Sequence, residues 1–185
     1  MPERFALFLG NTAPKKNTDR VLAAWAAARD GGLDIPLVIT DLPRPELRRR
    51  LQKVGGEAHL SAVIAPGYVP QEELACLYRA ATVFLYPSLA ESFGMPIVEA
   101  MACGAPVITS SVTAMPEIAG QAALLVDPTD VAAMTTAITA LVGSSALQDD
   151  LRQRGLQQAA RFRWEQAAAD VLQTYRAVLS ERRAA

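Results

Sequence analysis

Short aliphatic runs alternate with segments of helical spacing along most of this chain. Six such runs are bounded by turn residues and predict strands at 5–9, 36–40, 61–65, 82–86, 106–110 and 123–126. Within each run the hydrophobicity is nearly continuous, which is typical of parallel strands that are covered on both faces. We therefore expect an α/β domain in which helices pack on both sides of a parallel sheet.

The segments between these runs have apolar residues three or four positions apart, as in Val21 and Trp25 of the first segment. This spacing places the apolar side chains on one face of a helix. Asn17 precedes that segment and is a residue type that caps helices. Gly104 follows another helical segment and predicts a left-handed helix end.

After residue 143 the alternation ends, and the spacing predicts two helices at roughly 146–160 and 164–181. The second helix has a broad apolar stripe made of Trp164, Ala168, Val171, Leu172, Tyr175, Val178 and Leu179. A stripe of this width needs a surface to cover it, so we expect it to be exposed or self-associating. No repeat or linker divides the chain, which favours one domain over residues 1–185.

Composition excludes several classes of protein. The 185 residues are 51% hydrophobic with a formal net charge of -1, so one full-sized core is expected and nucleic-acid binding is not. No apolar stretch reaches the ~20 residues that span a bilayer. Cys76 and Cys103 lie in helix-like apolar segments, where we expect buried, reduced thiols and a cytoplasmic chain. A single histidine and the absence of an Asp-x-Asp motif predict no metal site.

The strongest functional signal lies in residues 91–108, which read ESFGMPIVEAMACGAPVI. They lead from a predicted strand through a tight loop into a buried helix, with Glu91 and Glu99 eight positions apart. In open α/β sheets, ligands bind beyond the carboxyl ends of strands, and the first turn of a helix offers free N–H groups to an anion. A plain tight turn would also require Gly94 and Pro96, so these two alone do not indicate a ligand.

Five blocks of sequence resemble, in order, the group 1 glycosyltransferases, which are retaining, nucleotide-sugar-dependent enzymes with the GT-B fold. The blocks are FLGNTAPKKN, GYVPQEELACLYRAATVFLYPS, ESFGMPIVEAMACGAPVITS, MPEIAGQAALLVDP and FRWEQAAADVLQTYR. The resemblance implies a Rossmann-like doubly wound sheet with two C-terminal helices, which is the C-terminal, donor-binding half of a GT-B enzyme. The N-terminal acceptor domain would be absent, either because the segment was excised from a longer protein or because the gene is short.

The resemblance also implies roles for individual residues. A family lysine that contacts the donor pyrophosphate corresponds to Lys16, although composition alone would make Lys15 and Lys16 ordinary solvated lysines. Glu91 would accept hydrogen bonds from the donor sugar, and we assign Lys16 and Glu91 to catalysis. Glu99 would bind the ribose, which is the role we favour; the alternative explanation for a carboxylate in an apolar helix is a buried ion pair with an arginine such as Arg79.

The remaining predicted donor contacts lie in loops. Asn11 follows Gly10 where many family members have arginine, so we expect one cation at the pyrophosphate and not a clamp of two. Tyr68 and Val69 would lie against the base, unless Tyr68 belongs to the core. The predicted donor-binding residues are Gly10, Asn11, Lys16, Tyr68, Val69, Glu91, Ser92, Phe93, Gly94, Met95, Pro96 and Glu99.

The implied function is transfer of a hexose from a UDP- or GDP-linked sugar to a hydroxyl of a glycan or glycolipid, as in polysaccharide biosynthesis. Helix amides and Lys16 would stabilise the departing nucleotide diphosphate, so no metal or other cofactor is expected. The isolated domain would bind its donor weakly and turn over negligibly. Any contact with the inner face of the membrane would be made through the absent domain. Two other classes stay open: a non-catalytic sugar-nucleotide binding module, and an epimerase or phosphorylase of the same fold.

Overall fold

The structure is a computed structural model and describes residues 2–184. One sheet of six parallel strands has the order β3-β2-β1-β4-β5-β6, which is that of a doubly wound fold. The strands are β1 (Ala6–Leu9), β2 (Leu37–Thr40), β3 (Val63–Gly67), β4 (Val83–Tyr86), β5 (Val107–Ser110) and β6 (Ala123–Val126). Each overlaps its predicted run, so the six-stranded parallel sheet is confirmed.

Helices connect the strands and continue beyond the last one. They are η1 (Pro14–Lys16), α1 (Thr18–Asp30), α2 (Arg44–Lys53), η2 (Glu57–Ala62), α3 (Gln71–Ala80), α4 (Met95–Ala102), α5 (Met115–Ala119), α6 (Val131–Val142), α7 (Ser145–Ala159) and α8 (Trp164–Ala184). The two predicted C-terminal helices are α7 and α8. The sequence pattern does not predict η1, η2 or α5, because such short pieces contain too little periodicity to recognise.

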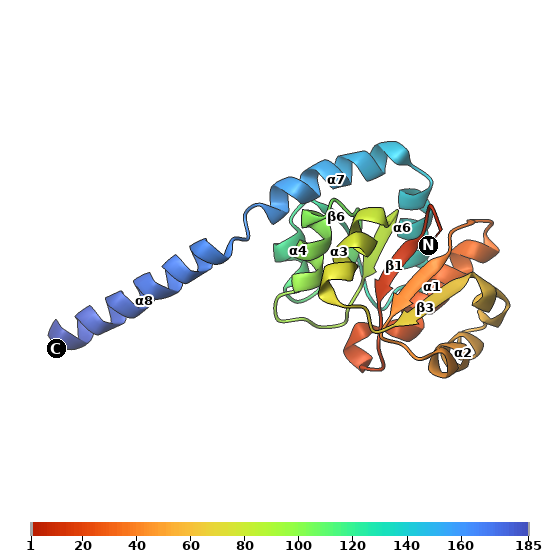
Figure 1. Cartoon of the computed structure of the whole chain (residues 1–185), viewed down its shortest axis with the longest axis horizontal. Coiled ribbons are helices and arrows are strands. Elements are labelled where there is room, and N and C mark those ends of the chain that lie inside the picture. The colour runs from red at the N-terminus through yellow and green to blue at the C-terminus, as the bar shows by residue number, and fades with distance from the viewer. Residues whose placement is uncertain (1, 185) are drawn as a thin grey trace.

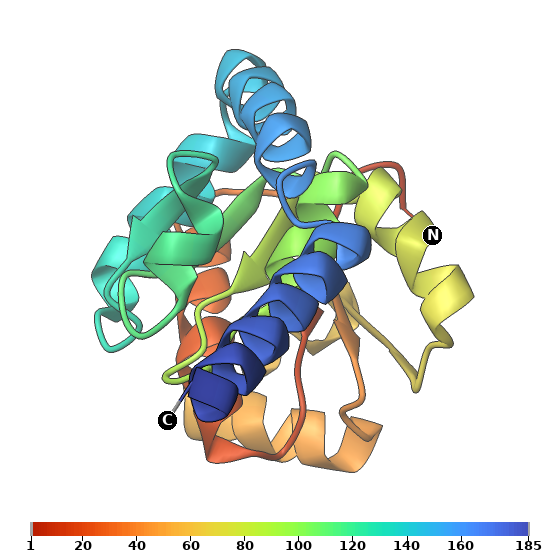
Figure 2. The same ribbon diagram turned by 90° about the vertical axis from the view of Figure 1, so that its left-hand side faces the viewer.

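The core has two layers, one on each face of the sheet. Helices α1, α2 and α6 cover one face, and α3, α4 and α5 cover the other; Figure 2 shows α3 (yellow) and α6 (cyan) on opposite sides. Along β1 the side chains alternate, with Ala6 and Phe8 in the first layer and Leu7 in the second. Both faces of a strand are therefore apolar, which explains the continuous hydrophobicity of the sequence runs.

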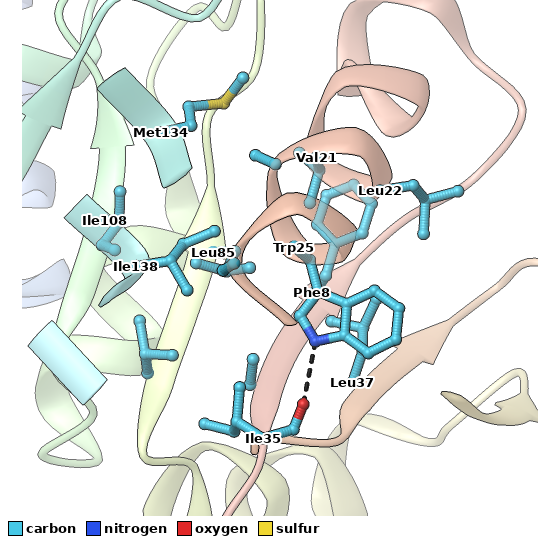
Figure 3. Packing of buried hydrophobic residues seen from close by; sticks show 14 of the residues in the cluster. Phe8, Val21, Leu22, Trp25, Ile35, Leu37, Leu85, Ile108, Met134 and Ile138 are labelled. Carbon is cyan, nitrogen blue, oxygen red and sulfur yellow. Dashed lines mark hydrogen bonds between the residues drawn. The ribbon is translucent and has the colours of Figure 1, made fainter. Parts of the chain in front are cut away.

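Trp25 fastens α1 to the sheet (Figure 3). Its ring is fully buried, and its indole Nε1–H donates a hydrogen bond of 3.0 Å to the carbonyl of Ile35, just before β2. A buried indole N–H needs such a partner, and the bond fixes the position of α1 along the strands. The N-terminal end of α1, which begins two residues after Lys16, is thereby held at the carboxyl edge of the sheet.

Helix α7 packs on the body, whereas α8 extends away from it (Figure 1). Leu151 of α7 belongs to the first layer and Ala159 to the second. On α8, Trp164 is 77% exposed and Tyr175 is 64% exposed, which confirms an uncovered apolar stripe. In the described residues no single helix is long and apolar enough to cross a bilayer. Val131–Val142 and Ser145–Ser180 together pass that test, by length and composition only, as a pair bent by 97°.

The prediction of two buried thiols is wrong. Cys76 is exposed, because it lies on the solvent side of α3 while the next two residues face the core, and Cys103 is partly buried; both cysteines are free thiols. Asn17 lies at the N-cap position of α1 as predicted, but it makes no side-chain capping bond, because its amide NH2 group donates to the carbonyls of Pro87 and Pro128. The predicted left-handed conformation of Gly104 is confirmed, with φ at 77°.

Candidate functional site

Two loops meet at the carboxyl edge of the sheet, one after β1 (residues 10–17) and one after β4 (residues 87–94). The two strands are neighbours, with Phe8 paired to Leu85. From β1 the chain continues toward β2 on one side, and from β4 toward β5 on the other. The loops therefore flank the topological switch point, which is where ligands bind in α/β proteins.

Lys16 and Glu91 form an ion pair between these loops. Lys16 Nζ lies 2.8 Å from Glu91 Oε1, and Lys15 Nζ lies 3.2 Å from the other carboxylate oxygen. The side chains of Lys16 and Glu91 are only 15% and 11% exposed, whereas that of Lys15 is 55% exposed. The structure thus brings together the two residues predicted to act in catalysis. Lys15 is solvated as expected, but it also pairs with the carboxylate from the solvent side.

Tyr86, the last residue of β4, completes this cluster. Its buried hydroxyl accepts a hydrogen bond of 2.7 Å from Lys16 Nζ and donates one of 2.9 Å to Glu91 Oε1. Lys16 Nζ also lies 4.6 Å from the centre of the tyrosine ring, within range of a cation–π interaction. The sequence did not single out Tyr86, because a tyrosine in the apolar run VFLY is typical of core. The feature of the sequence that could have identified Tyr86 as a site residue is its position at the carboxyl end of a predicted strand.

The surroundings set the ionisation of both acidic groups. Burial would raise the pKa of Glu91, but hydrogen bonds from Lys16, Tyr86 and Lys15 outweigh burial and hold the carboxyl pKa below its ordinary value. Burial, together with the bond to Glu91 and its negative charge, raises the pKa of Tyr86. At neutral pH the cluster therefore contains a carboxylate and a neutral phenol beside the Lys16 ammonium.

Helix α4 begins beside this cluster with an uncapped first turn. Gly94 has φ at 100°, and a Cβ atom there would lie 3.1 Å from Ile97 Cδ1, so glycine is required. No side chain caps the helix. Pro96 has no N–H, and the Ile97 N–H donates to the Gly94 carbonyl at 2.9 Å, so among the described residues the N–H groups of Gly94 and Met95 are the ones at this helix start that can bind an anion. Ser92 is exposed, Phe93 and Met95 are each 39% exposed, and Pro96 lies in the first turn.

The start of the β1 loop has its own constraints. A Cβ atom at Gly10 would lie 2.7 Å from Phe8 Cε1, so a larger residue would displace core side chains. Asn11 Oδ1 accepts a hydrogen bond of 2.9 Å from the Ala13 N–H, and the Asn11 carbonyl accepts one of 2.8 Å from the Thr18 hydroxyl. These bonds shape the loop that places Lys16.

Three further predicted residues, Glu99, Tyr68 and Val69, also lie outside the Lys16–Glu91–Tyr86 cluster. Glu99 accepts a hydrogen bond of 3.3 Å from the Tyr78 hydroxyl, and in the part of the chain that the structure describes it makes no ion pair, so the alternative of a bridge to Arg79 is wrong. Tyr68 is 80% exposed and is not core. It follows β3 with Val69, and β2 separates β3 from β1.

The structure also bears on metal binding. Within residues 2–184, no group of three or more histidine, cysteine, aspartate and glutamate side chains is placed to hold a metal ion. The candidate site contains the ammonium groups of Lys15 and Lys16.

Comparison with known proteins gives consistent matches. The family model described as "Glycosyl transferases group 1" matches residues 1–158. O-antigen chain mannosyltransferase B of Escherichia coli is 36% identical over 173 residues, which are 93% of this chain and 45% of that protein. A sucrose-phosphate synthase from Thermosynechococcus elongatus has a TM-score of 0.82 at 28% identity, covering 98% of this chain and 47% of the other.

A shorter solved structure matches over most of its own length. It is the C-terminal domain of a group 1 family glycosyl transferase from Francisella tularensis, with a TM-score of 0.71 at 24% identity, covering 85% of this chain and 84% of that one. The present chain spans less than half the length of the E. coli mannosyltransferase and of the synthase. The expected fold, a Rossmann-like half of a GT-B architecture, is confirmed. Since the family model covers most of the chain and the sheet has the expected order, the chain belongs to the group 1 glycosyltransferases.

Proposed function

We propose that this chain is the donor-binding domain of a metal-independent, retaining glycosyltransferase that transfers a hexose from a nucleotide sugar to a hydroxyl acceptor. The observation that supports this most strongly is the largely buried cluster of Lys16, Glu91 and Tyr86 at the switch point of the sheet. Two ammonium groups face one carboxylate, which leaves one positive charge in excess for an anionic ligand.

In the proposed complex each part of the site binds a different part of the donor. Lys16 turns from Glu91 to the pyrophosphate, and the free N–H groups at the start of α4 bind further phosphate oxygens. Glu91 then accepts hydrogen bonds from hydroxyls of the hexose while Tyr86 continues to donate to it. Glu99 binds the ribose in place of its long bond to Tyr78.

Cleavage of the bond between the anomeric carbon and the phosphate oxygen places negative charge on the leaving diphosphate. Lys16 and the helix N–H groups stabilise that charge, and we assign no metal to this step because they supply the required positive charge. In the proposed complex the Glu91 oxygens accept hydrogen bonds from the Tyr86 hydroxyl and from hydroxyls of the hexose, so we assign Glu91 to sugar binding and not to nucleophilic attack. We therefore propose attack by the acceptor on the face from which the phosphate leaves, and not double displacement.

The acceptor side of the reaction lies with a further domain. This chain spans 45% of the E. coli mannosyltransferase, so its proposed partner is an acceptor-binding domain that faces the carboxyl edge of the sheet. The name of that relative supports a glycan acceptor, and the cytoplasm is the proposed compartment. The isolated chain is expected to bind the donor weakly and to transfer negligibly.

The test is ligand-observed NMR on the purified chain with UDP, GDP, ADP and their sugars. We expect selective binding of one nucleotide, loss of that binding in Glu99→Ala, and no loss in the control Glu72→Ala, which removes an exposed carboxylate of α3. A folded wild type that binds none of these ligands would contradict the proposal. Conversion of a nucleotide sugar without an acceptor would indicate an epimerase instead, and transfer to free phosphate a phosphorylase.

A further inference from the structure

Asn17 connects three loops at the carboxyl edge of the sheet. Its side chain is buried, and Nδ2 donates hydrogen bonds to the carbonyls of Pro87 at 3.0 Å and Pro128 at 2.6 Å. Pro87 follows β4 and Pro128 follows β6, while Asn17 itself lies in the connection after β1. One amide group therefore joins segments that are 70 and 111 residues away along the chain.

The hydrogen-bond partners allow only one orientation of this amide. Two carbonyl oxygens require the NH2 group, and Arg20 Nη1, which lies 3.1 Å from Oδ1, requires an acceptor. Both hydrogens of the NH2 group and the oxygen are thus in use. A buried polar group that is fully satisfied in this way fixes the geometry of the segments it joins.

The backbone of Asn17 is also specialised. Its φ of 60° and ψ of 27° lie in the left-handed region, which asparagine and glycine adopt more readily than other residues. This conformation makes the turn from η1 into α1. Because Lys16 directly precedes the turn, the conformation of Asn17 helps to set the direction of the Lys16 side chain.

The beginning of the β4 loop is held at three consecutive residues. The Pro87 carbonyl accepts from Asn17, the Ser88 carbonyl accepts from the Ser110 hydroxyl, and the Leu89 N–H donates to the Lys15 carbonyl at 2.8 Å. Glu91 comes two residues later. Two of the three bonds come from residues adjacent to Lys16, so the segments that carry Lys16 and Glu91 are fastened directly to each other.

We infer that Asn17 is a positioning residue, which keeps Lys16 and Glu91 at hydrogen-bonding distance by fastening the loops after β1, β4 and β6 to one another. Its effect on donor affinity rests on the proposed function, whereas its effect on the ion pair does not. Asn17 itself touches neither ion-paired group through its side chain, and so it acts through the loops.

The test compares Asn17→Gly with Gln148→Ala. Glycine keeps the left-handed turn and removes the three side-chain bonds of Asn17. Gln148→Ala is a matched control, because Gln148 Nε2 also donates to two carbonyls, those of Leu141 at 2.8 Å and Val142 at 3.2 Å, at the end of α6. The measurements are the NMR titration of the Glu91 carboxyl in the ligand-free chain and the affinity for the nucleotide sugars of the panel above.

In Asn17→Gly we expect the pKa of Glu91 to rise toward its ordinary value, and the affinity for the bound nucleotide sugar to fall about tenfold because the Lys16 contact is misplaced. Gln148→Ala should change neither. Asn17→Ser, whose hydroxyl replaces at most one of the two donor bonds, is a milder second variant and should shift the titration in the same direction.

The outcomes separate the two proposals. A folded Asn17 variant in which Glu91 titrates as in the wild type overturns the positioning role. A shifted titration in a chain whose wild type binds none of the nucleotides supports the positioning role and contradicts the proposed function. A shifted titration with weakened donor binding supports both.

Discussion

The Lys16 ammonium and the Glu91 carboxylate lie 2.8 Å apart although 75 residues separate them along the chain. The pairing of β1 with β4 brings their loops to the same edge of the sheet, and Tyr86 bonds to both groups. The ligand-free site thus holds its cation in place through a carboxylate that the proposed donor also contacts. In the proposed complex Lys16 exchanges its hydrogen bond to Glu91 for hydrogen bonds to the pyrophosphate of the donor.

The two neighbouring lysines, Lys15 and Lys16, carry the same charge, but we expect them to contribute differently to nucleoside diphosphate affinity because only Lys16 is largely buried. Lys16→Met is expected to weaken binding of a nucleoside diphosphate at least about tenfold, because it removes a charge-assisted hydrogen bond from a largely buried group. Lys15→Met removes the same charge from a side chain that is 55% exposed, and we expect about a twofold loss. Calorimetric titration measures both, and equal losses would mean that charge alone matters.

The hydroxyl of Tyr86 should contribute to stability and to phosphate binding. Tyr86→Phe removes two hydrogen bonds to charged groups and should lower the free energy of unfolding by about 1–3 kcal/mol. It should also weaken binding of inorganic pyrophosphate several-fold, since Lys16 loses an anchor. Tyr78→Phe is the matched control, because it removes one 3.3 Å bond to Glu99 and should not change pyrophosphate affinity. Similar pyrophosphate affinities for Tyr86→Phe and the wild type would exclude this role.

The pH dependence of stability should report on Glu91. Because its pKa in the folded chain is lowered, its stabilising contribution is present above the unfolded pKa of ~4.3 and is lost as pH falls through the folded value. The stability difference between the wild type and Glu91→Gln should therefore be constant near neutrality and change in favour of the variant below about pH 4. Urea unfolding between acidic and neutral pH measures this difference. A difference that does not vary with pH would contradict the lowered pKa.

Helix α8 should contribute little to the stability of this chain. The apolar side chains of α8 that the structure describes are exposed, and none belongs to either core layer. Removing residues 164–185 should shift the unfolding midpoint by less than about 2 °C and reduce association at high concentration in sedimentation experiments. Leu151→Ala in α7 is the contrasting variant. Because Leu151 is buried, we expect it to lower the free energy of unfolding by about 2–5 kcal/mol. A large fall in the midpoint on removing α8 would show that the helix packs on the body in solution.

Much of the fold follows from local sequence. The strands, most helices and the exposed stripe of α8 were predicted because hydrophobic spacing reports which face of an element is covered. The short α5 was missed for lack of periodicity, and the exposure of Cys76 was missed because neighbouring positions on one helix can face opposite sides.

The sequence by itself determined the α/β class, the family resemblance and the segments that form the two central loops, because strand and helix periods and motif order are properties of consecutive residues. Only the tertiary structure decided which side chains meet. Tyr86, Lys15 and Asn17 join the site through contacts across 70 residues or more, and Glu99 has a phenol as its partner and not Arg79. Such contacts depend on the pairing of β1 with β4 and on the direction of each side chain at the strand ends, and no local pattern specifies either one.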